Sequence, residues 1–111
     1  METYAGRCIL RLCPVVEMEL WRGVRTEVAR NLVQDLVEDT VSLPVPTPIM
    51  WRAGGQYLAQ FRNDFDLVTL ERLQNDVLIA LTAYYSGALL FTRDKHFERL
   101  RKKIPFKLEL I

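Results

Sequence analysis

Two aspartates in the C-terminal half of the chain carry the clearest chemical signal. Asp76 opens a predicted helix over residues 76–86, and Asp94 follows a predicted strand over residues 88–92. In an open α/β sheet, the N-termini of helices and the C-termini of strands lie at the same edge, where ligands bind. The two carboxylates are therefore expected to face each other across a cleft, although 18 positions separate them in the sequence.

A third acid, Glu19, is predicted at the same edge, because it lies in the first turns of the helix that follows the first strand. Glu17 is close in sequence, but its side chain points about 200° away around a helix. Three oxygen ligands without a paired His or Cys suit a hard cation. Mg²⁺ or Mn²⁺ fits best, because such ions accept one or two carboxylates and keep several waters. The ion would activate water and stabilise charge on a phosphoryl group.

Each of these residues also has a structural explanation. Asp76 could be an acid favoured at a helix N-terminus, Asp94 could cap the next helix, and Glu19 could be a solvated helix residue. Thr92 could hold a water or a phosphate oxygen beside Asp94, or simply fill a strand end. His96 could act as a general base, or be an exposed residue of a surface helix. The predicted placement of the acids at one edge favours the metal site.

Composition and charge limit the classes of function. A chain of 111 residues suffices for one small domain, and its net charge of +1 gives no global basic field for nucleic acid. A local basic stretch over residues 93–107 could be an RNA track or a solvated helix face. No apolar run approaches the roughly 20 residues of a membrane span, and no signal peptide is apparent, so a cytoplasmic protein is predicted. No Gly-rich phosphate loop or Ser/His/Asp arrangement supports nucleotide binding by a P-loop or acyl transfer.

The cysteines and tryptophans are predicted to pack rather than to react or bind. In an extended segment, the odd separation of Cys8 and Cys13 places their thiols on opposite faces, so they cannot form a disulfide. His96 is the only histidine, which leaves no second ligand pair for a zinc site. Trp21 and Trp51 are predicted to be packing residues rather than platforms for base stacking.

Strands that alternate with helices predict an α/β protein with a parallel sheet. A first strand over residues 8–13 is followed by one long helix over residues 16–38, with apolar residues at every fourth position. A proline-rich extended segment over residues 42–48 precedes a second helix, which starts at Thr47 and Pro48. Gly54 and Gly55 argue against an unbroken helix there.

The C-terminal half is predicted to begin with a polar connection over residues 62–74, with one helical turn near residues 69–73. Asn75 is expected to cap the helix of residues 76–86, and Gly87 is expected to end it. The remaining predicted elements are a strand over residues 88–92, a basic helix over residues 95–103 and a strand over residues 106–110. No repeat or linker is apparent, so a single domain over residues 1–111 is predicted.

The residues of this half resemble the PIN domain family, as in VapC-type toxins. The resemblance rests on Asn-Asp-Val-Leu-Ile-Ala-Leu-Thr-Ala at 75–83, Gly-Ala at 87–88, Phe-Thr-Arg-Asp-Lys-His-Phe at 91–97, and Glu-Leu at 19–20 with Gly23. It runs from about residue 9 onward. It implies an α/β fold of the PIN-like three-layer α/β/α type, with a mostly parallel sheet. It also implies an endoribonuclease that depends on Mg²⁺ or Mn²⁺.

Carried over by position, the resemblance implies that Glu19, Asp76 and Asp94 are metal-site acids and that Thr92 is a supporting polar residue. RNA would be the substrate. Family members of this type often form homodimers and are held inactive by a small antitoxin protein. The resemblance therefore implies a homodimer and an antitoxin partner.

The chain departs from this family in two places. Members begin with a strand that ends in an aspartate, and then a helix, before the strand that matches residues 8–13. Residues 1–7 are too short for that unit, so an N-terminally truncated domain is expected, or a true start upstream of Met1. His96 stands where many relatives carry an acid. Two hypotheses follow: an RNase that is active or impaired, or an inactive remnant that binds an antitoxin-like partner or its own copy.

Overall fold

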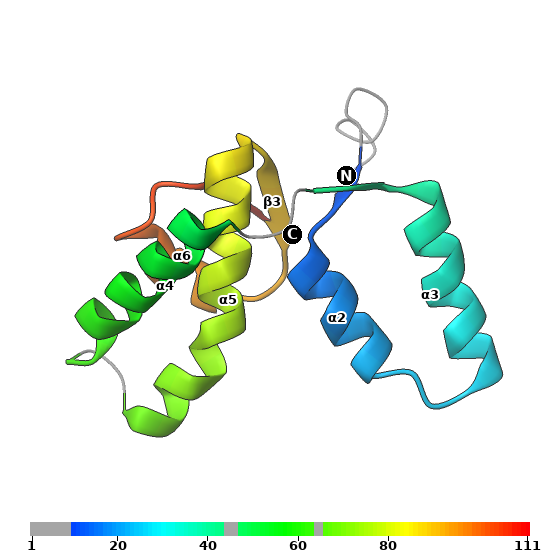
Figure 1. Ribbon diagram of the computed structural model, residues 1–111, viewed down its shortest axis with the longest axis horizontal. Coiled ribbons are helices and arrows are strands. Elements are labelled where there is room, and N and C mark those ends of the chain that lie inside the picture. The colour runs from blue at the N-terminus through cyan, green and yellow to red at the C-terminus, as the bar shows by residue number, and fades with distance from the viewer. Residues whose placement is uncertain (1–9, 44–46, 64–65) are drawn as a thin grey trace. The chain divides into compact units, whose positions relative to one another are not determined.

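The computed structural model describes residues 10–43, 47–63 and 66–111 and divides the chain into two compact units. Unit 1 comprises Met1–Val45 and unit 2 comprises Pro46–Ile111. Within its described residues, each unit combines helices with a two-stranded parallel sheet (Figure 1). The predicted α/β class with parallel strands is confirmed. Among the described residues, no helix is long and apolar enough to cross a membrane.

Unit 1 has two helices between two short strands. Its elements are β1 (Arg11–Leu12), α2 (Pro14–Arg22), α3 (Glu27–Asp39) and β2 (Val41–Ser42). The strands pair in parallel, with Arg11 opposite Val41 and Leu12 opposite Ser42. β1 lies within the predicted strand of residues 8–13, whose first part, including Cys8, lies outside the described residues. Cys13 is buried and free, as predicted for a small hydrophobic residue.

The prediction of one helix over residues 16–38 is wrong, because the chain breaks between α2 and α3. The N–H of Gly23 donates to the carbonyls of Glu19 and Leu20, which closes α2. The Thr26 hydroxyl then accepts a hydrogen bond from the N–H of Ala29 at 3.1 Å and caps α3. The break comprises four residues, so the four-residue apolar spacing of the sequence runs across it although residues 23–26 are not helical.

Unit 2 is built around one central helix. Its elements are α4 (Pro48–Phe61), α5 (Leu67–Ser86), β3 (Leu89–Thr92), α6 (His96–Arg101) and β4 (Lys107–Leu110). α5 contacts α4, α6 and β3, and α4 lies along it in Figure 1. Seven consecutive residues of α5, 77–83, are buried, so every face of the helix is covered there. β3 and β4 pair in parallel, from Leu89 opposite Lys107 to Thr92 opposite Leu110.

The polar connection predicted over residues 62–74 is wrong from Leu67 onward, although the helical turn predicted near residues 69–73 lies within the observed helix, and residues 64–65 lie outside the described residues. α5 begins at Leu67, because the Asp66 carboxylate accepts a hydrogen bond from the N–H of Thr69 at 2.7 Å and caps the helix there. Asn75, the predicted cap, therefore lies inside α5. Gly87 ends the helix in the left-handed conformation, with φ of 64°, as predicted.

Other local predictions for unit 2 have mixed outcomes. The start of α4 is confirmed, since the Thr47 hydroxyl accepts a hydrogen bond from the N–H of Met50 and Pro48 is the first helical residue. α4 continues unbroken through Gly54 and Gly55. The strands at both ends of α6 and the basic helix itself are confirmed, with bounds shifted by one or two residues. Trp51 is 57% exposed, so its prediction as a packing residue is wrong.

Two glycine substitutions in unit 2 are expected to change stability in opposite directions. A Cβ added at Gly55 meets nothing within 4 Å, so Gly55→Ala should raise the free energy of unfolding by about 0.5–1 kcal/mol. Gly87 is left-handed, so Gly87→Ala should lower that free energy by about 1–2 kcal/mol. Urea unfolding of both variants measures the two shifts. Shifts of the same sign would contradict this account of the backbone.

Candidate active site

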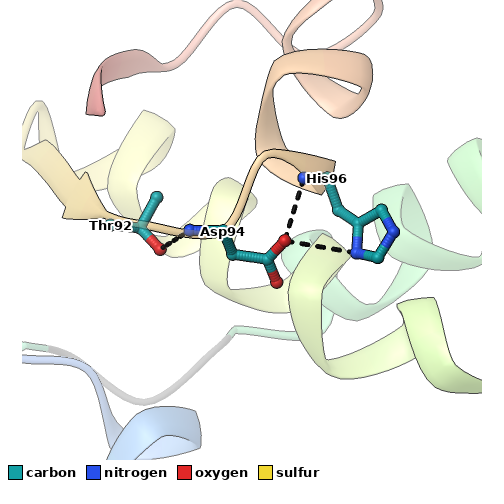
Figure 2. Close-up of polar contacts among 3 residues, drawn as sticks. All are labelled: Thr92, Asp94 and His96. Atoms are coloured by element: carbon teal, nitrogen blue, oxygen red, sulfur yellow. Dashed lines mark hydrogen bonds and ion pairs between the residues drawn. The ribbon is translucent and has the colours of Figure 1, made fainter. Parts of the chain in front are cut away.

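Asp94 lies two residues beyond β3, in the turn that leads into α6, and contacts within this turn fix its position (Figure 2). The Thr92 hydroxyl accepts a hydrogen bond from the backbone N–H of Asp94, with 3.1 Å between nitrogen and Oγ1. Oδ1 of Asp94 accepts a hydrogen bond from the backbone N–H of His96 at 2.9 Å. The same oxygen lies 3.2 Å from Nδ1 of His96, which makes an ion pair when the imidazole is protonated.

These contacts use one oxygen of the Asp94 carboxylate. Within the described part of the chain, no hydrogen bond engages the other oxygen, Oδ2. The Asp94 side chain is 46% exposed. The explanation of Asp94 as the N-cap of the next helix is wrong, because the N-cap of α6 is Lys95; Oδ1 instead closes the turn before α6, and Oδ2 remains accessible to water or a cation. One carboxylate can serve both purposes.

Thr92 and His96 have definite roles in this turn. The hydroxyl of Thr92, at the end of β3, holds the backbone of Asp94. The sequence predicts either a general base or an exposed residue at His96, and its side chain is 62% exposed. Its contact with Asp94 was missed. The separation of two residues across a strand-to-helix turn is the sequence signal that could have indicated it, because Asp side chains commonly bond to the backbone two residues ahead.

Asp76 does not lie at a helix N-terminus, so the reason for its predicted placement is wrong. α5 begins nine residues earlier, at Leu67. The side chain of Asp76 is half-buried, at the border of the buried residues 77–83. The effect of the helix dipole falls off within the first turn, so it cannot explain an acid at this depth in the helix. Asp is also disfavoured in helix interiors. The helix N-terminus therefore does not explain the acid at position 76.

Glu19 lies in α2 and is half-buried. Its neighbour Glu17 has a structural partner, because one of its carboxylate oxygens accepts a hydrogen bond from the Trp21 indole N–H, at 3.1 Å. Residues four apart on a helix are neighbours on its surface, so this contact lies along α2. It accounts for Glu17, and the predicted metal-site acid of α2 remains Glu19, as the family resemblance implies.

The donors are of the right chemical type for a hard divalent cation, which binds carboxylate oxygens. Among the described residues, no group of three or more His, Cys, Asp or Glu side chains could hold a metal ion together. Glu19 belongs to unit 1, whereas Asp76 and Asp94 belong to unit 2. The convergence of these three carboxylates on one ion stays a prediction.

The family model of the PIN domain matches residues 5–103, which is most of the chain. The chain belongs to the PIN domain family. PIN domains belong to a superfamily of nucleases. They generally use divalent metal ions and bind RNA. The match includes Glu19, Asp76 and Asp94, and it continues across the division between unit 1 and unit 2. No curated protein matches the chain.

Proposed function

We propose that this PIN domain chain is an endoribonuclease of the VapC toxin type, which hydrolyses phosphodiester bonds of RNA with Mg²⁺ or Mn²⁺. We further propose that it acts in the cytoplasm and that its 111 residues form a single domain. The family match carries the proposal, because it spans both units and all three candidate acids. The accessible carboxylate of Asp94 beyond β3 supports it, since a nuclease needs an anionic ligand that can reach an ion.

In this proposal Glu19, Asp76 and Asp94 hold the ion, which would activate water and stabilise the negative charge that develops on the phosphoryl group. The turn around Asp94 prepares one of these ligands. The N–H of His96 fixes Oδ1, and Thr92 fixes the backbone, so the carboxylate loses little freedom when it binds.

Dependence on a divalent ion tests this function directly. The purified chain should cleave RNA with Mg²⁺ or Mn²⁺, lose that activity in EDTA, and regain it when the ion is restored. An Asp94→Asn preparation purified in parallel controls for contaminating nucleases, because a contaminant would cleave equally in both samples. Cleavage that persists in EDTA would contradict the proposal.

An exchange of two adjacent residues tests the position of the carboxylate in α5. The double substitution Asn75→Asp and Asp76→Asn keeps composition and net charge but moves the carboxylate about 100° around the helix. If Asp76 is a metal ligand, cleavage should fall by about tenfold or more. Circular dichroism on heating checks that α5 is still folded, because both residues are half-buried. Unchanged cleavage by a folded exchange variant would remove Asp76 from the site.

A second candidate function is protein binding without catalysis, and the surface of α3 favours it. Val28, Leu32 and Leu36 are 71%, 65% and 41% exposed, and no residue of α3 is buried. Side chains four residues apart share one face of a helix, so the three form a stripe that we call the α3 stripe. Exposed apolar patches mark interaction surfaces. The occupant would be a second copy of the chain, giving a homodimer, or a small antitoxin-like protein.

A further inference from the structure

Positive charge is concentrated in the last part of unit 2. Residues 93–109 contain seven Lys or Arg and three Asp or Glu. Residues 1–92 contain eight Lys or Arg and eleven Asp or Glu. The net charge of +1 therefore conceals a segment of +4 and a remainder of −3, so a local interaction with an anion is possible where the whole chain gives no basic field.

Three of these cations line two adjoining shallow depressions of the surface. The first depression is lined by Glu98, Arg101, Lys102, Leu108 and Leu110. The second is lined by Leu89, Arg101, Pro105, Phe106, Lys107 and Leu108. Because the depressions share Arg101 and Leu108, they form one continuous surface from α6 to β4. We call Arg101, Lys102 and Lys107 the basic strip.

Within the described part of the chain, the three cations of the basic strip outnumber the single carboxylate that lines the same surface, Glu98. All three side chains are exposed, and none forms an ion pair there. Cations are favoured at the C-terminal end of a helix, which could explain Arg101 and Lys102 beside the end of α6. It does not explain Lys107, which lies on β4 and lines the same continuous surface. Their common placement therefore points to an anionic ligand.

We propose that the basic strip binds the phosphate backbone of the RNA that is cleaved at Asp94. This inference rests on the proposed function, since it assigns part of the substrate path to that site. α6 begins two residues after Asp94 and ends at Arg101, so the site and the strip lie at opposite ends of one short helix. Six helical residues span about 9 Å, a distance that a few nucleotides cover.

The chemistry of the strip selects the backbone rather than the bases. Phe106, the aromatic residue of the second depression, is only 4% exposed, so it offers no face for base stacking. Lysine and arginine charges at a surface suit phosphate oxygens, which position a nucleic acid without reading its sequence. Binding through the strip is therefore independent of sequence and sensitive to salt.

Binding of a fluorescent single-stranded oligoribonucleotide in EDTA tests the strip without cleavage. The variant Arg101→Gln/Lys102→Gln/Lys107→Gln should bind at least about tenfold more weakly at low salt. Each phosphate contact to a single strand contributes about 0.7 to the slope of log affinity against log salt. Loss of three contacts should therefore make the slope shallower by about 2. An acidic peptide is then added as a competitor of the same oligonucleotide. Its effect on the bound fraction shows whether the strip binds RNA or acidic peptides.

A control with the same loss of charge is Arg25→Gln/Arg30→Gln/Arg72→Gln, three exposed arginines outside the strip. This control should retain the parent slope. Equal weakening of both variants, no binding by the parent chain, or a strip that binds the acidic peptide but not RNA would each overturn the inference. If the parent binds RNA through the strip but does not cleave it, the proposed function fails and the strip stands. If the parent cleaves RNA but the strip variant binds RNA as tightly as the parent, the proposed function stands and the inference about the basic strip fails.

Discussion

Asp94→Asn is expected to lower metal-dependent RNA cleavage by more than about a hundredfold, because removing even an outer partner of a metal ligand costs about 10–100-fold. The folded state should be kept. The amide oxygen of asparagine can still accept the hydrogen bond from the N–H of His96, so the turn into α6 is retained. The free energy of unfolding should therefore change by less than about 1 kcal/mol, the range of an exposed ion pair. Cleavage assays and urea unfolding of the same preparation measure both quantities.

Two further variants separate the charge of Asp94 from its hydrogen bond with the N–H of His96. Asp35→Asn makes the same chemical change at an exposed position of α3, and it should leave cleavage unchanged. Asp94→Ala removes both the charge and the oxygen that accepts from His96, so it should also lower stability by about 0.5–1.5 kcal/mol, the contribution of one hydrogen bond. Parent-level cleavage by Asp94→Asn, together with an unstable Asp94→Ala, would make Asp94 a purely structural residue.

The segment around Asp94 could be predicted from the sequence because its signals are local. Gly87 adopts the left-handed conformation that glycine tolerates best, so it fixes the end of α5 wherever that helix begins. The apolar residues of β3 then lead to a short polar turn and a basic helix. Each of these signals depends on a few neighbouring residues. The bounds of these elements are accordingly close to the prediction.

The start of α5 and the break between α2 and α3 were missed because competing local signals exist there. Asn75 and Asp66 are both good helix caps, and the buried contacts of α5 with its neighbours favour the longer helix. A stripe with a period of four residues likewise cannot reveal a break of four residues, and only Gly23 and Thr26 mark it. Because α5 begins at Leu67, Asp76 lies in a helix interior and not at a helix N-terminus.

Leu32→Glu is expected to convert a self-associated chain into a monomer and to raise the dissociation constant of a dimer by at least about thirtyfold. Leu32 is the middle residue of the α3 stripe, and a central contact of an interface contributes about 2 kcal/mol or more. A difference of that size corresponds to about thirtyfold in affinity. Burying a carboxylate without a partner would weaken association further. Sedimentation equilibrium across a range of concentrations measures the constant for the parent and the variant.

The position of Leu32 makes this test selective for association. Its side chain is already 65% exposed, so a glutamate there should change the free energy of unfolding of the isolated chain by only about 0.5 kcal/mol. Ile49→Glu is the matched control, because Ile49 is 61% exposed on α4, outside the α3 stripe. A dimer that resists Leu32→Glu but is lost in Ile49→Glu would move the interface from α3 to α4. A compact monomeric parent would show that the α3 stripe does not form a homodimer. Co-purification of the parent and Leu32→Glu chains with a co-expressed antitoxin-like protein then decides whether the stripe binds that protein.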